Sequence, residues 1–398
     1  MRKILFSSLF FISVCVLMSC CQTSQSIHRT TPEKVGINSK KLIQVDAIIQ
    51  ESIENGEIPG AVLAVVHHGS LVYLKAYGNK SVVPQVEPMT VNTVFDLASV
   101  SKPVGTATSI MQLVENGKLR LTDPVSMYIP GFLPWVDPET KRSVEIRIID
   151  LLTHTSGLPS YITATLLTEK YGSPNPKALI DSIATSRRMF RPTTRVLYSC
   201  LNFITLQNVL QNITGQPLCD YAKEHIFDVL GMKNTMYNPT GATLALTAPT
   251  EKQPDGSVLL GKVHDPLARL LNDGNSGNAG LFSNAEDLAL YAAAILNGGA
   301  YNGKRILSPL TVETMTRVPE EVSSLGRNLG WGINTGTLFD PEKSYGHTGY
   351  TGTSIMIDPV SQTAVILLSH RVHPEDKGSI ARLRVLVANV VVGAIVRK

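Results

Sequence analysis

Two side chains that can do chemistry stand three residues apart in residues 95–104, the hydroxyl of Ser99 and the amine of Lys102. The pattern of residues 104–116 predicts a helix that ends at Gly117, and positions i and i+3 of a helix share one face, so the two groups can meet. Burial favours a neutral lysine, which can take a proton from a hydroxyl. A helix N-terminus also offers N–H groups to an oxyanion. The alternative is that Ser99 only caps the helix and Lys102 is solvated, because such a cap has the same spacing.

Two later stretches favour a functional role for Ser99 and Lys102 over a simple helix cap. Tyr198 stands just before a predicted helix, and residues 344–352 predict an edge strand whose glycines let a substrate backbone approach closely. A buried tyrosine or a glycine-rich turn is ordinary when it occurs alone. The order and separation of the three stretches indicate that they contribute to one functional site.

Composition and charge narrow the function classes. The 398 residues are 43% hydrophobic and 17% charged, which is typical of a globular protein with one large domain or two closely packed ones. The formal charge is +4, and we identify no basic cluster interleaved with aromatic residues, so we expect no nucleic-acid partner.

No spacing of His, Cys and carboxylate residues resembles a metal site, and we expect no metal or cofactor. Only Cys200 and Cys219 lie in the predicted folded body, so a disulfide framework is not indicated.

The first residues predict export. Arg2 and Lys3 precede an apolar run over residues 4–18 that is too short to span a bilayer comfortably, so residues 1–19 are predicted to be a signal peptide. The run ends in Leu17-Met18-Ser19-Cys20, which resembles a bacterial lipobox, and residues 20–34 are then a lipidated tether that starts at Cys20. An ordinary cleaved signal peptide is the alternative. We expect a monomer in the bacterial cell envelope, held to a membrane by this anchor.

The predicted elements indicate an α+β fold. A helix and a β-hairpin come first, a mostly helical region follows, and strands with a closing helix come last. The simplest arrangement is one antiparallel sheet completed by both ends of the chain, with a helical domain inserted between them. We therefore expect a sheet-containing domain from residues 35–98 and 326–398, a mostly helical domain from residues 99–325, and a site at their interface.

Three motifs in this order resemble the serine β-lactamase and penicillin-binding-protein superfamily, on the side of class C β-lactamases, D-alanyl-D-alanine carboxypeptidases and esterases. Ser99-Val100-Ser101-Lys102 matches the family's Ser-x-x-Lys, Tyr198-Ser199-Cys200 stands at its Tyr-x-Asn, and His347-Thr348-Gly349 stands at its Lys-Thr-Gly. Residues 151–158, 263–266 and 277–283 also resemble recurring family segments, and the resemblance spans residue 35 to the C-terminus.

The resemblance implies a role for each motif. Ser99 would attack an acyl carbonyl and form an acyl-enzyme, while Lys102 and Tyr198 would share its proton, and the sequence leaves open which of them is the base. The N–H groups of Ser99 and Tyr350 would form the oxyanion hole. The strand of His347, Thr348 and Gly349 would border the substrate.

Two departures from the family pattern bear on the substrate. A thiol at Cys200 lacks the amide hydrogen bonds that an asparagine gives to a bound acylamide group. A histidine at position 347 is mostly neutral near pH 7, which weakens the attraction of a substrate carboxylate. Both changes argue against an efficient β-lactamase.

These residues predict an exported serine hydrolase that acts on an ester or a D-amino-acid-type amide. One alternative is an acyltransferase that passes the acyl group to an alcohol. The other is a penicillin-binding or sensing protein that is acylated without turnover.

Overall fold

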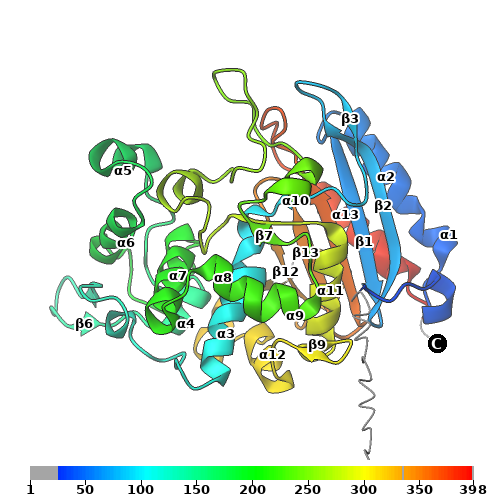
Figure 1. Ribbon diagram of the computed structural model, residues 1–398. Coiled ribbons are helices and arrows are strands. Elements are labelled where there is room, and N and C mark those ends of the chain that lie inside the picture. The colour runs from blue at the N-terminus through cyan, green and yellow to red at the C-terminus, as the bar shows by residue number, and fades with distance from the viewer. Residues whose placement is uncertain (1–25, 334–335, 397–398) are drawn as a thin grey trace, which may run out of the picture.

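A seven-stranded antiparallel sheet is the main feature of the fold, in the order β11-β12-β13-β14-β1-β2-β3 (Figure 1). The structure, a computed structural model, describes residues 26–333 and 336–396. In the middle of the sheet β1 (Gly60–His67), from the N-terminal part, pairs with β14 (Thr363–Ser369), from the C-terminal part. The predicted α+β fold, with a sheet built from both ends of the chain, is confirmed.

The residue types of β1 explain its central place. All eight of its residues are buried. Val62, Ala64 and Val66 join the larger hydrophobic core on one face, and the alternate residues pack into a smaller core on the other face. Successive side chains of a strand point to opposite faces, so an unbroken apolar run suits a strand that is covered on both sides.

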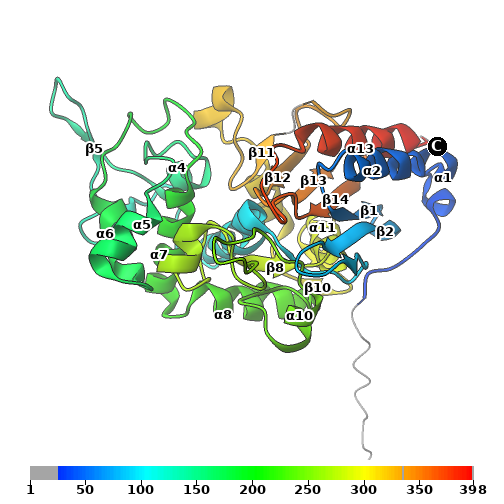
Figure 2. The ribbon, with the colours of Figure 1, turned by 90° about the horizontal axis from the view of Figure 1, so that it is seen from above.

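Helices cover both faces of the sheet. α2 (Gln44–Glu54) and α13 (Ala381–Ala394) lie together on one face, and α11 (Ala285–Leu296) packs against β1 and β14 on the other (Figure 2). α11 belongs in sequence to residues 99–325, so the sheet layer takes one helix from the middle of the chain. The apolar side of α13 faces the sheet, with Leu383 and Val387 in the smaller core.

Several of the remaining helices form a separate group beside the sheet, on the left in Figure 1, whereas the short helix α1 (Ser39–Leu42) packs against α13. The other α-helices are α3 (Thr108–Glu115), α4 (Ile148–Leu152), α5 (Ala164–Tyr171), α6 (Pro176–Thr185), α7 (Cys200–Thr214), α8 (Leu218–Ala222), α9 (Asp228–Leu230), α10 (Gly241–Leu246) and α12 (Pro309–Thr316). The other strands are β2 (Ser70–Ser81), β3 (Glu87–Pro88), β4 (Phe95–Asp96), β5 (Trp135–Val136), β6 (Ser143–Val144), β7 (Met236–Tyr237), β8 (Leu281–Ser283), β9 (Ala300–Tyr301), β10 (Lys304–Arg305), β11 (Gly332–Ile333), β12 (Tyr345–Thr348) and β13 (Ser354–Asp358).

Several predicted boundaries are wrong for identifiable reasons. The first helix starts after Asn38, whose side chain accepts from the Lys41 N–H, and it is interrupted at Ile43. The helix predicted for residues 104–116 starts earlier, as a wide π-type turn over Lys102–Ala107 that continues into α3. The sequence pattern also predicts a helix over residues 144–152 and a strand over residues 329–334; the structure forms only α4 in the first range and, among the described residues of the second, only β11.

The targeting segment falls outside the part that can be described. The predicted signal peptide, Cys20 and the first residues of the tether all precede residue 26. Over residues 26–333 and 336–396, no helix is long and apolar enough to cross a bilayer. Cys200 and Cys219 are both free thiols, so they form no disulfide with each other.

Candidate active site

Ser99 lies on a tight turn directly after β4. Ala98 adopts a left-handed backbone conformation with φ of 46°, which is uncommon for a residue with a side chain. The buried Asp96 carboxylate stabilises this turn by accepting from the Ala98 N–H at 2.8 Å. The turn continues as a short 3-10 helix, Ala98–Val100, in which Ser99 is half-buried and the residues on either side are buried. The turn thus presents the Ser99 hydroxyl at an open position.

Lys102 is fully buried beneath Ser99. Its Nζ donates to Ser99 Oγ at 2.8 Å and to the carbonyl oxygen of Asn278 at 2.8 Å, and it lies 3.8 Å from Cys200 Sγ. Burial lowers the pKa of Lys102, but the negative charge that Cys200 and Tyr198 carry when ionised raises it by more, so the pKa lies above its usual value. The expectation that burial leaves this amine neutral is therefore wrong for the free protein. Lys102 rests as an ammonium.

Tyr198 is held in place by His154. The carbonyl of His154 accepts from the Leu197 N–H at 3.0 Å, and its Nδ1 accepts from the Ser199 N–H at 3.1 Å, so His154 fixes the backbone on both sides of Tyr198. Its ring packs on the tyrosine ring at 4.4 Å between centroids. Lys102 Nζ lies 5.0 Å from the centre of the same tyrosine ring.

The tautomer of His154 follows from its neighbours. The side-chain nitrogen of Asn202 lies 3.1 Å from His154 Nδ1, while Ser156 Oγ donates to Asn202 Oδ1 at 2.6 Å. Two donors therefore point at Nδ1, and the ring proton must be on Nε2. Through these contacts Asn202 supports the chain around Tyr198.

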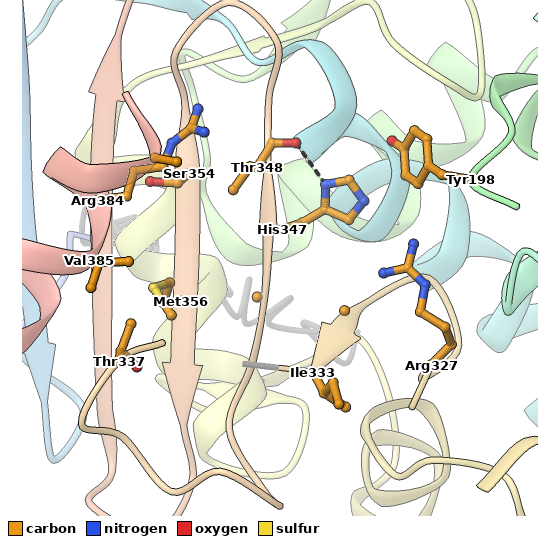
Figure 3. Close-up of a pocket in the computed structure, with 13 residues that line it drawn as sticks. Tyr198, Arg327, Ile333, Thr337, His347, Thr348, Ser354, Met356, Arg384 and Val385 are labelled. Carbon is orange, nitrogen blue, oxygen red and sulfur yellow. Dashed lines mark hydrogen bonds between the residues drawn. The ribbon is translucent and has the colours of Figure 1, made fainter. Parts of the chain in front are cut away.

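β12 carries the third motif along the cleft. His347 Nδ1 lies 2.9 Å from the Thr348 carbonyl oxygen, to which it must donate, and its ring points to the side where Tyr198 and Arg327 lie (Figure 3). Burial, with the nearby charges of Lys102 and Arg327, lowers the pKa of His347 to about 3. His347 is therefore neutral throughout the physiological range, as the sequence suggested.

Two threonine hydroxyls join the sheet to the turn of residues 96–100, which carries the predicted nucleophile Ser99 and is called the nucleophile turn below. Thr351 Oγ1 donates to the Asp96 carbonyl at 2.7 Å, and Thr353 Oγ1 donates to the Leu97 carbonyl at 2.8 Å. Gly349 packs so closely on Leu97 and Thr353 that a Cβ atom there would clash with both. These contacts place the segment of Tyr350 beside that of Ser99, which is the arrangement that the predicted oxyanion hole requires.

One cleft of about 600 Å³ gathers the sequence-predicted residues. Its walls include Ser99, Tyr198, His347, Thr348, Gly349 and Tyr350. Lys102 and Cys200 lie beneath Ser99, within the contacts given above. In the described part of the chain, no three His, Cys, Asp or Glu side chains are grouped to hold a metal ion. The catalytic roles of the gathered residues remain predictions.

The sequence interpretation missed three cations: Arg371 and Arg384 line the cleft of Ser99, and Arg327 lines an adjoining cavity. The guanidinium carbon of Arg327 lies 5.8 Å from the centre of the Tyr198 ring, at one end of a cavity of about 410 Å³ beside β11 and β12 (Figure 3). Gly332 makes room for it, because a Cβ atom there would lie 2.9 Å from Arg327 Nη1. Among the described residues, no carboxylate pairs with Arg327, and its Nε is buried without a hydrogen-bond partner.

Comparison with known proteins agrees with this geometry. The sequence model of the Beta-lactamase family matches residues 45–389. The chain belongs to the Beta-lactamase family. A protein of Escherichia coli strain K12 named "Putative D-alanyl-D-alanine carboxypeptidase" is 32% identical, over 94% of this chain and 91% of its own length. A protein of the same name from Salmonella gallinarum is 33% identical, over 86% and 85% of the two chains.

Solved structures of the family share the fold. One is EstCE1, described as a hydrolase with promiscuous acyltransferase activity, with a TM-score of 0.71 at 24% identity, over 88% of this chain and 98% of EstCE1. Another is the octameric penicillin-binding protein homologue of Pyrococcus abyssi, with a TM-score of 0.66 at 22% identity, over 88% and 76% of the two chains. Together with the family match and the carboxypeptidase relatives, these findings indicate that the chain is a serine hydrolase of the β-lactamase type.

The low pKa of His347 predicts a stability effect. In the unfolded chain its pKa returns to about 6.5, so between this value and the folded value the unfolded state binds more protons and the free energy of unfolding falls as the pH falls. His347→Asn should reduce this fall by up to about 1.4 kcal/mol per pH unit. Urea unfolding at pH 7 and pH 5 measures it, with the exposed His68→Asn as the control. Equal pH slopes in the wild type and His347→Asn would contradict the assignment.

Proposed function

We propose that this chain is an exported hydrolase that forms an acyl-enzyme on Ser99 and releases the acyl group to water. The observation that carries the proposal is the 2.8 Å contact between Ser99 Oγ and Lys102 Nζ, in a cleft that also presents Tyr198 and the His347-Thr348-Gly349 edge. Within residues 26–333 and 336–396, no other serine hydroxyl combines a hydrogen bond to a buried amine with an adjacent phenol.

The proposed reaction has two steps. In its reactive form the Lys102–Tyr198 pair carries one proton less than an ammonium and a phenol. Ser99 Oγ attacks the acyl carbonyl while its proton passes to this pair, and the pair then gives a proton to the departing alcohol or amine. Water then attacks the ester on Ser99, gives a proton to the same pair and releases the acid, while Ser99 recovers its proton. The N–H groups of Ser99 and Tyr350 would stabilise the oxyanion in both steps, and each such donor contributes about 10²–10³-fold to the rate.

Arg327 supports a substrate that carries a carboxylate near the scissile bond. It supplies, from the segment before β11, the positive charge that a lysine at position 347 would have given. This weakens the sequence argument that the neutral His347 disfavours carboxylate substrates. A peptide ending in D-alanyl-D-alanine fits this requirement, and the names of the relatives point the same way. We therefore favour a D-amino-acid carboxypeptidase over a simple esterase.

Replacement of the nucleophile tests the proposal. Ser99→Ala should reduce hydrolysis of a nitrophenyl ester and of a D-alanyl-D-alanine peptide by at least about 10³-fold, because no oxygen remains to form the acyl-enzyme. Mass spectrometry of the wild type should show an adduct on Ser99. Retained activity in Ser99→Ala would refute the assignment.

The same assay separates the alternatives. A stable adduct on the wild type without multiple turnovers would favour a penicillin-binding or sensing protein. Faster product formation with an added alcohol, and an ester product, would favour an acyltransferase.

Removal of the cation tests the substrate class. Arg327→Ala should lower kcat/KM for the D-alanyl-D-alanine peptide by about 10- to 100-fold, since a charge-assisted hydrogen bond to a carboxylate contributes about 1.5–3 kcal/mol. Hydrolysis of a neutral acetyl ester should change less than threefold, and Arg327→Lys should recover part of the peptide activity. An equal loss of kcat/KM on both substrates would show that Arg327 does not bind the substrate carboxylate.

Export and lipid attachment are part of the proposal and rest on the sequence of residues 1–34. In a bacterial host, Cys20→Ala should move the protein from the membrane fraction to the soluble fraction, because the lipidated cysteine is lost. Cys21→Ala is the matched control and should remain in the membrane fraction. Continued membrane association of Cys20→Ala would count against the anchor. A monomeric state also remains a prediction.

A further inference from the structure

The main-chain segment that carries Tyr350 is closed on itself as a tight turn. The Gly349 N–H donates to the Thr353 carbonyl at 2.7 Å, and the Gly352 N–H donates to the Gly349 carbonyl at 3.2 Å. The Tyr350 N–H makes no hydrogen bond to another described residue, so it is free to bind an oxyanion. The position of this donor therefore depends on how the turn of residues 349–353 is held.

Arg384 holds this turn from the C-terminal helix α13. Its Nη2 donates to the Gly349 carbonyl at 2.9 Å and to the Thr353 carbonyl at 3.0 Å. These are the two carbonyls that also accept the main-chain bonds of the turn, so one guanidinium group joins both of its ends. The neighbouring Leu383 is buried in the smaller core and α13 packs on α2, which fixes the base of the arginine side chain.

The charge of Arg384 is directed at main-chain groups and not at a carboxylate. Among residues 26–333 and 336–396, no Asp or Glu side chain forms an ion pair with it, and its Nε is buried without a hydrogen-bond partner. Burial, with the nearby charge of Arg371, lowers the pKa of Arg384 to about 10, so the group is a cation at neutral pH. A charged donor makes stronger hydrogen bonds than a neutral one, so both carbonyls of the turn are strongly polarised.

The Gly349 carbonyl belongs to the same peptide group as the Tyr350 N–H. This peptide bond is trans, and in a planar trans peptide the C=O and N–H bonds point in opposite directions. Because the carbonyl is directed at Arg384, the N–H is directed to the other side of the turn, which packs on Leu97 and lines the cleft of Ser99. Consecutive hydrogen bonds polarise one another, so a cation on the carbonyl makes the N–H a stronger donor.

We propose that Arg384 is a positioning residue of the oxyanion hole, which orients the Gly349–Tyr350 peptide group and strengthens the Tyr350 N–H as a donor through the carbonyl of that group. Arg384 does not contact the reacting atoms in this assignment. Its role differs from that of Arg327, which we expect to bind the substrate carboxylate, and the two arginines lie on opposite sides of β12 in the view of Figure 3. The inference rests on the proposed function, since it concerns the acyl-enzyme of that site.

The substrate dependence of the loss tests the inference. An oxyanion forms on every acyl substrate, so Arg384→Ala should lower kcat/KM for the neutral acetyl ester and for the D-alanyl-D-alanine peptide by a similar factor, about 10- to 100-fold. Arg384→Lys keeps a cation beside the turn and should be at least about fivefold faster than Arg384→Ala on both substrates. The matched control Arg382→Ala, which removes an exposed arginine from the same helix, should stay within about twofold of the wild type.

The acyl carbonyl of the adduct on Ser99 gives a readout that a change in stability alone would not move. Its infrared stretching frequency falls as the hydrogen bonds to its oxygen strengthen, because these bonds polarise the C=O group. With an isotope-labelled acyl ester, the adduct of Arg384→Ala should therefore absorb at a higher frequency than the adduct of the wild type. The adduct of Arg382→Ala should absorb at the wild-type frequency.

Three results would overturn the inference. The first is kcat/KM of Arg384→Ala within about twofold of the wild type on both substrates. The second is a loss confined to the peptide, which would make Arg384 a ligand of the substrate carboxylate. The third is an unchanged acyl carbonyl frequency in Arg384→Ala. If circular dichroism shows that Arg384→Ala does not fold, Arg384→Gln, which keeps a neutral donor, allows the same comparisons. Failure of the proposed function is distinct, because the wild type would then form no adduct on Ser99.

Discussion

The buried ammonium of Lys102 is the constraint on which the site depends. An ammonium that loses its water must find acceptors in the protein, and isolated burial would cost several kcal/mol. Here the acceptors come from the nucleophile turn and from the segment before β8, with the Tyr198 ring nearby. Each of these segments must keep its place for the charge to be tolerated, so one cation organises parts of the chain that are almost 180 residues apart.

The same logic extends to the junction between the sheet and the helices. Ser99 comes before most of the helices in the sequence and Tyr350 comes after β12. The oxyanion hole that we expect therefore requires these two segments to be aligned. Thr351 and Thr353 provide that alignment by donating to main-chain carbonyls of the nucleophile turn. These hydroxyls are buried, where exchange with water cannot replace a broken bond, and the alignment is correspondingly firm.

Local signals predicted much of this architecture. The apolar run of β1 and the periodicity of α6 and α11 depend only on neighbouring residues. The sequence pattern predicts helices over residues 176–185 and 285–296, and the structure has helices with these bounds. The start of α11 shows the limit of such rules. Ser283 and Glu286 fit a capping box, but Asn284 caps the helix by accepting from the Asp287 N–H, while the Ser283 hydroxyl lies 2.6 Å from that of Thr235. A distant partner thus decided between two equivalent caps.

The parts of the site that the sequence did not reveal depend on distant contacts. Arg327 is a single arginine in a connecting segment, and its place in the cavity beside Tyr198 depends on how that segment packs on β11. His154 lies in a segment that resembles a structural family motif, and its hold on Tyr198 appears only once Leu197 and Ser199 are seen to bond to it. The three motifs that resemble the family's were found from sequence because each is compact, whereas these supporting residues have no local pattern.

The short length of β11 has a consequence for how a substrate can lie in the cleft. Its pairing with β12 covers Tyr345 and Gly346, and in the described part of the chain it does not continue to His347 and Thr348. The main-chain groups of β12 that point away from β13 in this part are therefore an unpaired sheet edge beside Ser99, although the Thr348 carbonyl already accepts from the His347 ring. An extended peptide can complete this edge with its own N–H and C=O groups, in the manner of β-strand addition. Recognition would then begin with the shape of the substrate backbone, before any side chain is read.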